Sequence, residues 1–252
     1  MNSRSVVFNL IMINIVLFVA SIVYPVLNQY LSLQYLFNRH DFVQLAANGT
    51  LSYQEYPALY SFIERNYGAL SKAGFLPVQI LSHMFMHGGI AHIAFNMLGL
   101  FMFGNVLERV WGPKRFFIFY FITGLGAVIL HLLVQAIMVY KFTGTFDPTP
   151  AMLNAHPGAF DTYFSSTLGA SGAIFGILIA FAMLFPNTEL MLIFFPIPVK
   201  AKYLVSLYVI FELYEGFANH AGDDVAHFAH LGGALFGFIL VKYWNRTGQN
   251  FY

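Results

Sequence analysis

Six long apolar segments constrain the fold of this chain more than any other feature of its sequence. They cover residues 6–24, 90–107, 116–140, 168–185, 203–219 and 226–244. A helix of about 20 residues crosses the roughly 30 Å hydrocarbon layer of a membrane. The segments therefore predict an all-α, polytopic membrane protein in which residues 1–252 form a single domain with six transmembrane helices.

The scarcity of charge agrees with a membrane location. Only 9% of the 252 residues are charged and 58% are hydrophobic, whereas about 25% of the residues in a soluble domain are charged. The mean hydropathy is +0.67. The few lysines and arginines form no stripe that could follow a phosphate backbone, so nucleic-acid binding is not expected. The absence of cysteine excludes disulfides, thiolate nucleophiles and cysteine-ligated metals.

The distribution of basic residues predicts the orientation. If both termini are cytoplasmic, the inner segments hold eight of the twelve lysines and arginines, as cytoplasmic loops usually do. The run 6–24 is too long for a signal-peptide core and is interpreted as a retained span. The loop 25–89 is rich in aromatic residues, which predicts short, partly embedded helices at the outer interface. The stretch 190–199, broken by Pro196 and Pro198, is interpreted as an interfacial lead-in to the fifth span.

Four polar residues inside the apolar segments are candidates for chemistry, because polar groups at membrane depth are costly and usually functional. His92 and Asn96 lie in the second segment, Ser171 in the fourth and His230 in the sixth. These three spans run in the same direction under the predicted topology. Each of the four residues lies within the first turns of its span, so all are expected at a similar shallow depth below the outer surface.

Glycines beside Ser171 and His230 predict a close approach of two helices. Gly169 and Gly172 flank the serine, and Gly233 follows the histidine. Small residues let helix backbones come near each other, which would bring an imidazole within hydrogen-bond distance of a hydroxyl. A serine becomes a nucleophile when an adjacent base takes its proton, and a neutral histidine is such a base.

His92 and Asn96 are four residues apart and therefore share one face of a helix. If that face points toward the serine, both side chains can donate hydrogen bonds to the oxyanion of a tetrahedral intermediate. The backbone N–H of Ser171 is a further possible donor. The pair could equally hold two helices together, and the two roles are compatible.

These residues lie in a series of motifs that resembles the rhomboid intramembrane proteases. The motifs are His-Met-Phe-Met-His at 83–87, His-Ile-Ala-Phe-Asn at 92–96, Gly-Ala-Ser-Gly at 169–172 and His-Leu-Gly-Gly at 230–233. The stretch Glu-Arg-Val-Trp-Gly-Pro-Lys-Arg at 108–115 is similar to the family's segment after the second span. Four ordered motifs at family-like spacing make the resemblance specific over about residues 75–240.

The resemblance implies a six-helix rhomboid-like bundle and an intramembrane serine endopeptidase that cleaves transmembrane segments of other proteins. Ser171 is the implied nucleophile, His230 the general base, and His92 and Asn96 the oxyanion contacts. The fifth span is implied to be a lateral gate for the substrate. No cofactor is expected. The compact chain suggests the plasma membrane of a bacterium, with the active site open to the outer side.

Two positions depart from the family pattern. The Trp-Arg pair that many members carry before the first histidines is replaced by Val78 and Gln79, so the anchoring of that loop must differ. Many members have a tyrosine four residues after the serine that stacks on the catalytic histidine. Phe175 stands there in this chain, and its ring can still stack without the hydroxyl.

A zinc-dependent membrane hydrolase is the alternative with a different mechanism. Its ligands would be His83, His87, His227 and His230, of which the first two have helical spacing. The His-Glu-x-x-His pattern of metalloproteases is absent from the sequence.

Several acidic residues leave other roles open. Asp223 or Asp224 is a candidate for a third member that orients His230, although the family is understood to use a dyad. Glu212 and Glu215 lie inside the fifth apolar segment, where their role is open and a transporter would place paired charges. A non-catalytic binding protein of the same fold is the last alternative. Inactive relatives lose the serine or the histidine, and this chain keeps both.

Overall fold

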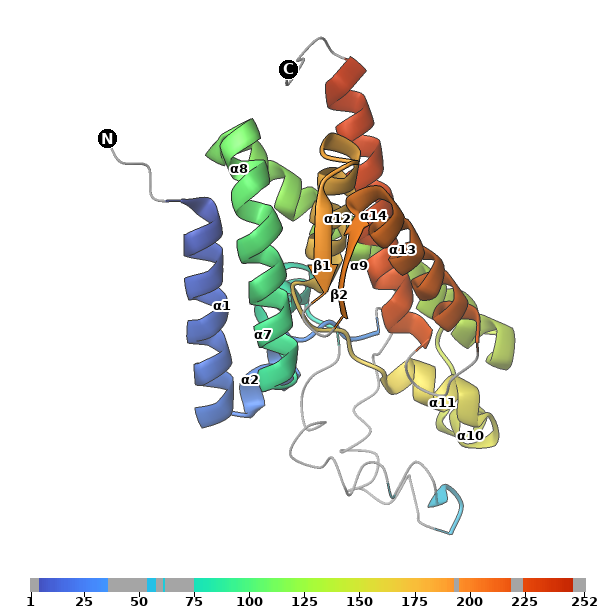
Figure 1. Cartoon of the computed structure of the whole chain (residues 1–252). Coiled ribbons are helices and arrows are strands. Elements are labelled where there is room, and N and C mark those ends of the chain that lie inside the picture. The colour runs from blue at the N-terminus through green and yellow to red at the C-terminus, as the bar shows by residue number, and fades with distance from the viewer. Residues whose placement is uncertain are drawn as a thin grey trace.

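The computed structural model describes residues 5–35, 54–57, 61, 75–192, 195–218 and 224–246, which are mostly helical. Figure 1 shows the helices side by side, with a small hairpin between two of them. The elements are α1 (Val6–Val23), α2 (Val26–Leu31), α6 (Gln79–Ser82), η1 (His83–Phe85), α7 (Ile90–Gly99), η2 (Leu100–Gly104), α8 (Asn105–Trp111), α9 (Pro113–Thr143), α10 (Pro150–Ala155), α11 (Pro157–Phe164), α12 (Ser171–Leu184), β1 (Glu189–Leu192), β2 (Phe195–Lys200), α13 (Ala201–Phe217) and α14 (Asp224–Arg246).

A helix lies at each of the six predicted spans. Among the described residues, three helices are long and apolar enough to cross a membrane: α1, the continuous helix Ile90–Trp111 made of α7, η2 and α8, and α9. Helix α12 is apolar but shorter, at 14 residues. Membrane crossing by α12, α13 and α14, and with it the count of six spans, stays a prediction.

The prediction of an all-α fold missed a two-stranded antiparallel hairpin between α12 and α13. Glu189 pairs with Lys200 and Leu190 with Val199 in β1 and β2. The sequence indicates an interfacial lead-in here, because two prolines interrupt the stretch. Proline lacks a backbone N–H and breaks helices, but an edge strand tolerates it. A hairpin of two strands consists of edges only, so this apolar stretch can be extended.

The predicted loop 25–89 is described only in part. Its first and last segments form the short helices α2, α6 and η1. The stretch 36–74 lies outside the described residues except for 54–57 and 61. The prediction of a partly embedded loop therefore stays a prediction.

The first turn of α1 and the last turn of α14 lie at the same end of the helical assembly, and α10 and α11 lie at the opposite end (Figure 1). From the start of α1 to the end of α14, the chain therefore runs an even number of times between the two ends of the assembly. Which end faces the cytoplasm stays a prediction.

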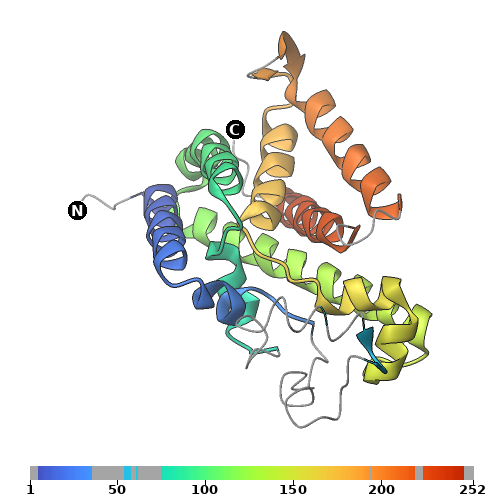
Figure 2. The same cartoon turned by 90° about the horizontal axis from the view of Figure 1, so that it is seen from below.

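Helices α9, α12 and α14 pack against one another and form the centre of the molecule. Buried side chains of α9 and α12, including Phe116, Phe119 and Ile177, join those of α1 and η2 in one apolar core. Helix α13 packs mainly on α14 and lies at the periphery, as Figure 2 shows from below. The described part of the molecule therefore has a closely packed centre and one peripheral helix.

The segment 108–115 forms the corner between the second and third apolar helices. Gly112 ends α8 with φ 78°, a conformation that glycine adopts without steric cost. Pro113 then starts α9, where its fixed φ suits the first helical position. The carboxylate of Glu108 accepts hydrogen bonds from the backbone N–H groups of Val6 at 2.7 Å and Val7 at 3.0 Å. This corner therefore also caps the beginning of α1.

Candidate active site

The structure brings Ser171 and His230 into hydrogen-bond contact. Ser171 is the first residue of α12, and His230 lies on α14. The serine Oγ and the histidine Nε2 are 2.8 Å apart, and both side chains are partly buried. The two residues are 59 positions apart in the sequence, so this contact depends on how the two helices pack.

Glycines at the helix interface make this contact possible. A Cβ atom added to Gly233 would overlap the backbone carbonyl of Gly172. One turn further along, a Cβ on Gly237 would lie only 2.8 Å from the Cα of Gly176. The backbones of α12 and α14 are therefore in direct contact, at a distance that no larger residue would allow.

The ring of Phe175 stacks on the imidazole of His230. The two ring centroids are 4.4 Å apart, with 7° between the planes. The same phenylalanine contacts the ring of Tyr208 on α13, with centroids 4.7 Å apart. Phe175 thus limits the rotation of His230 on one face, as the sequence had suggested for a ring at this position.

The segment that leads into Ser171 is tied to three other parts of the chain. Thr167 and Leu33 exchange two backbone hydrogen bonds, at 2.8 and 3.0 Å. The hydroxyl of Thr167 bonds the buried imidazole of His131 on α9, and the N–H of Gly169 donates to the carbonyl of His83 at 2.8 Å. These contacts fix the backbone immediately before the serine. Nothing in the sequence alone singles out Thr167 and His131.

His92 lies beside the turn that precedes Ser171. Gly169 has φ 123°, a conformation that side chains disfavour. A Cβ atom at this position would also lie 2.7 Å from Nε2 of His92. The N–H of Gly88 points to Nδ1 of His92 at 3.4 Å, a long hydrogen bond. The glycine therefore leaves room for the imidazole next to the nucleophile candidate.

Asn96 lies one turn after His92 and is buried. Its side-chain amide donates to the backbone carbonyl of His92 at 3.0 Å. An amide nitrogen carries two hydrogens, so this bond uses only part of its donor capacity. In the arrangement described, Asn96 thus stabilises its own helix. Its predicted contact with an oxyanion stays a prediction.

The four histidines of the zinc alternative are not assembled into one site. Within the described ranges, the only group of three or more potential ligands consists of Glu212, His227 and His230, with donor atoms within 4.8 Å of one another. His83 and His87 do not belong to it. Both are buried, and burial lowers the pKa of each to about 4. The prediction of a four-histidine site is therefore wrong, and among the described residues the group that could hold an ion shares only His227 and His230 with it.

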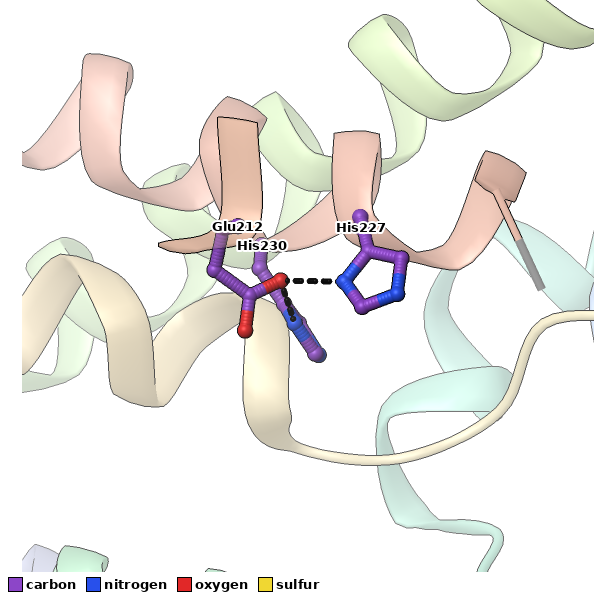
Figure 3. Close-up of side chains that lie close together, drawn as sticks. All are labelled: Glu212, His227 and His230. Carbon is purple, nitrogen blue, oxygen red and sulfur yellow. Dashed lines mark hydrogen bonds and ion pairs between the residues drawn. The ribbon is translucent and has the colours of Figure 1, made fainter. Parts of the chain in front are cut away.

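Glu212 is the site residue whose role the sequence left open. Figure 3 shows its carboxylate on α13, facing two imidazole rings of α14. One oxygen, Oε2, accepts from Nδ1 of His227 at 2.7 Å and from Nδ1 of His230 at 2.8 Å. The residue is only 3% exposed. Its signal in the sequence was an acidic residue inside an apolar segment.

The side chains of Asp223 and Asp224, the aspartates that the sequence offers as partners of His230, lie outside the described part of the structure. Asp223 lies outside the described residues, and only the backbone of Asp224 is described. Among the described side chains, the carboxylate that contacts His230 is that of Glu212. The carboxylate that contacts the histidine thus comes from helix α13 and not from the loop in which the sequence places Asp223 and Asp224.

Comparison with known proteins gives a consistent result. The sequence model of the Rhomboid domain matches residues 77–246. RHOMBOID-like protein 12, mitochondrial, of Arabidopsis thaliana is 34% identical over 166 residues, which are 64% of this chain and 44% of that protein. Rhomboid protein 1, mitochondrial, of Saccharomyces cerevisiae is 28% identical over 170 residues, 68% of this chain and 42% of that protein.

A bacterial relative carries a functional name. Rhomboid protease AarA of Providencia stuartii is 30% identical over 168 residues, which are 62% of this chain and 52% of that protein. The chain thus spans about half the length of these relatives or somewhat less. The matched region includes Ser171, His230, His92 and Asn96 within the domain limits.

Proposed function

The chain belongs to the rhomboid family, and on that premise we propose that it is an intramembrane serine endopeptidase that cleaves transmembrane segments of other membrane proteins. Ser171 is the nucleophile and His230 the general base. The observation that carries this proposal is the 2.8 Å distance between the serine Oγ and the histidine Nε2. This is the geometry in which an imidazole can take the hydroxyl proton as attack begins.

The reaction needs an exposed peptide bond, whereas an intact transmembrane helix holds each carbonyl in its own hydrogen bonds. The substrate therefore enters sideways between α7 and α13 and unwinds locally at the site. Ser171 attacks the scissile carbonyl carbon, and its proton passes to Nε2 of His230. His230 then returns this proton to the leaving amine as the C–N bond breaks. Water hydrolyses the acyl-enzyme with the same base.

The oxyanion of the tetrahedral intermediate needs hydrogen-bond donors. The backbone N–H of Ser171 is one of the free N–H groups in the first turn of α12, where the helix dipole also favours negative charge. His92 beside the turn is the second donor in this proposal, and the free amide hydrogen of Asn96 is the third. Three glycines support the site: Gly169 leaves room for His92, Gly233 for the backbone of α12, and Gly172 for Ala127 of α9. Phe175 supports it by stacking on His230.

Membership of the rhomboid family supports a broad statement about the class of substrate and about a membrane location. Rhomboid proteins are integral membrane proteins, and the family's proteases act on membrane proteins within the bilayer. We propose a transmembrane protein as the substrate of this chain. The bacterial plasma membrane, cytoplasmic termini and a site open to the outer side remain predictions, since two of the relatives named above are mitochondrial.

The proposal is tested with a Ser171→Ala variant in liposomes that contain a transmembrane substrate. Cleavage should fall by at least about 10³-fold, because residual catalysis without the nucleophile is small. Ser206→Ala is the matched control. It removes the same hydroxyl from an exposed position on α13 and should cleave at the wild-type rate. The measurement is the initial rate of product formation on a gel.

A fluorophosphonate probe gives an independent test of the nucleophile. Mass spectrometry of the labelled wild-type protein should find the probe on Ser171 alone, and the His230→Ala variant should not be labelled. Cleavage that persists in Ser171→Ala would refute the proposal. Loss of wild-type cleavage on chelation, with recovery on adding zinc, would instead favour metal-dependent hydrolysis.

A further inference from the structure

We infer that Glu212 is a positioning residue for His230, so that the site works as a chain of serine, histidine and carboxylate with its acidic member on the peripheral helix α13. The inference rests on the proposed function and deepens it. It starts from one juxtaposition: Oε2 of Glu212 lies 2.8 Å from Nδ1 of His230, whose other ring nitrogen faces Ser171 at 2.8 Å.

The carboxylate selects the tautomer of His230. A neutral imidazole carries one N–H, and an ionised carboxylate can only accept a hydrogen bond. The proton of His230 therefore lies on Nδ1, where it is donated to Glu212. Nε2 is left as an acceptor and faces the hydroxyl of Ser171. Without the carboxylate, the opposite tautomer would place a proton on Nε2, and that form cannot act as the base.

The same carboxylate also stabilises the charge that develops during the reaction. When His230 takes the proton of Ser171, it becomes an imidazolium with Glu212 in direct contact. Glu212 is 3% exposed, and the attraction between two charges is stronger where little water screens them. This interaction is present only after proton transfer, so it lowers the barrier and does not simply tighten substrate binding.

His227 holds the carboxylate in place. It lies three residues before His230, so both imidazoles are on one face of α14. Its Nδ1 donates to the same oxygen, Oε2, at 2.7 Å (Figure 3). Two donors on one oxygen fix the position of a side chain that would otherwise have several rotamers. A bond from Glu212 to His227 alone would suffice to join the two helices, so joining them does not explain the second bond to His230.

The position of Glu212 makes the base depend on α13. Ser171, His230 and Phe175 all lie on α12 and α14, whereas the carboxylate belongs to a helix that packs mainly on α14. If α13 moves away from α14, His230 loses its partner at Nδ1 while Ser171 stays in place. His230 is therefore fully competent only while α13 is docked.

The decisive variant is Glu212→Gln, with Glu215→Gln as the control that removes an identical charge from the same helix. Glu212→Gln should lower kcat and the rate of fluorophosphonate labelling by about 10²-fold or more, since loss of a positioning carboxylate is severe in serine hydrolases. KM should change by less than about 3-fold, because the substrate does not touch this residue. Glu215→Gln should match the wild type in both rates.

Glu212→Asp separates a positioning role from a purely structural one. It keeps the charge on a shorter side chain, so its kcat should lie between those of the wild type and Glu212→Gln, again with an unchanged KM. If Glu212→Gln does not fold, as judged by its thermal unfolding midpoint, the comparison of Glu212→Asp with Glu215→Asp decides. A lower kcat in the first alone supports the inference, and equal kcat values overturn it.

The remaining outcomes separate this inference from the proposed function. If Glu212→Gln is labelled and cleaves at the wild-type rate while Ser171→Ala is inactive, the positioning role is overturned and the protease proposal stands. If Ser171→Ala retains activity, the protease proposal itself fails. Zinc-restored activity after chelation overturns the inference as well, because Glu212, His227 and His230 would then act as ligands.

Discussion

Two of the helices that pack against α14, namely α12 and α13, differ in how closely they are held. Nine of the 14 residues of α12 are buried, and its glycines bring its backbone into contact with that of α14. Only four of the 17 residues of α13 are buried: Ala201, Val205, Glu212 and Gly216. Most large apolar side chains of α13 are exposed, including Tyr203, Leu207, Ile210, Phe211, Tyr214 and Phe217. The first interface is closely packed, and we interpret it as rigid, whereas the second has few buried contacts.

The difference teaches how a site can be both precise and accessible. Ser171 and His230 lie on the rigid interface, where a change of a few tenths of an ångström would alter their hydrogen bond. Regions with few buried contacts open at low free-energy cost, so α13 can move while the serine and histidine stay together. In this interpretation, Glu212 can bond His230 only while α13 lies against α14. The position of the movable helix therefore affects the base of the rigid pair.

Among the tests of this comparison, the largest effect is expected when one methyl group is added to the α12–α14 interface, with the same addition to the α13–α14 interface as its counterpart. Gly233→Ala would place Cβ on the backbone carbonyl of Gly172, which no rotamer change can relieve. The helices must separate, so labelling of Ser171 should fall by more than about 100-fold. Gly216→Ala on α13 meets the ring edge of Phe228 at 3.2 Å, and that ring can turn. Its labelling should stay within about 3-fold of the wild type.

Helix propensity cannot explain this expected difference. Alanine is a better helix former than glycine by about 1 kcal/mol. Both substitutions therefore favour their own helix by the same free energy. The rate of fluorophosphonate labelling and the thermal unfolding midpoint in detergent measure the outcome. If Gly216→Ala is as damaging as Gly233→Ala, the two interfaces do not differ in rigidity and the comparison fails.

The sequence predicted the rigid interface better than the movable one. Glycines next to Ser171 and His230 signal a close helix contact directly, because only small residues permit it. The placement of both residues on separate apolar helices also followed from the length of the segments. Glu212 could not be assigned, since a single acidic residue in an apolar segment shows neither its partner nor the face on which it lies.

Other elements depended on tertiary contacts that the sequence does not display. The β1 and β2 hairpin forms where two prolines exclude a helix, but proline alone does not distinguish an extended loop from paired strands. The contact between Thr167 and His131 joins a loop to α9 across 36 residues. Polar residues of this kind are identified only once the fold brings them together.

A second prediction concerns the backbone hydrogen bond between Gly169 and His83, which anchors the segment before Ser171. The stability of this anchor should depend on pH. His83 is 3% exposed, and its carbonyl accepts from the N–H of Gly169. Burial lowers its pKa from 6.5 to about 4. Above pH 6.5 the imidazole is neutral both in the native and in the opened state, so the anchor is fully stable. As the pH falls from 6.5 to 4, only the opened state takes up a proton, and stability is lost.

Between pH 6.5 and pH 4, the free energy needed to open this anchor falls by roughly 3 kcal/mol. Hydrogen exchange of the segment 165–171, corrected for the intrinsic rate at each pH, measures it as faster opening in acid. The His83→Gln variant lacks one of the two buried imidazoles, His83 and His87, whose pKa is lowered to about 4, and should show a flatter dependence. An identical pH dependence in that variant would assign the effect to another group.

The smallest effect is expected at Phe175, the ring that lies between the two regions. It stacks on His230 on the rigid side and contacts Tyr208 of α13 on the other. Phe175→Leu removes the stacking and should lower kcat by about 2- to 10-fold, since such ring pairs contribute 0.5–1.5 kcal/mol. Phe175→Tyr keeps the ring and should stay within about 2-fold of the wild type.

Tyr208→Leu removes the opposite contact and completes the comparison. The stacking of Phe175 on His230 remains in this variant, so kcat should be close to that of the wild type if the rigid side alone orients the histidine. Steady-state cleavage of the same liposome substrate measures all three variants. A loss in Tyr208→Leu as large as that in Phe175→Leu would mean that α13 orients the imidazole through its aromatic ring as well as through Glu212. The boundary between the rigid and the movable region would then pass through His230 itself.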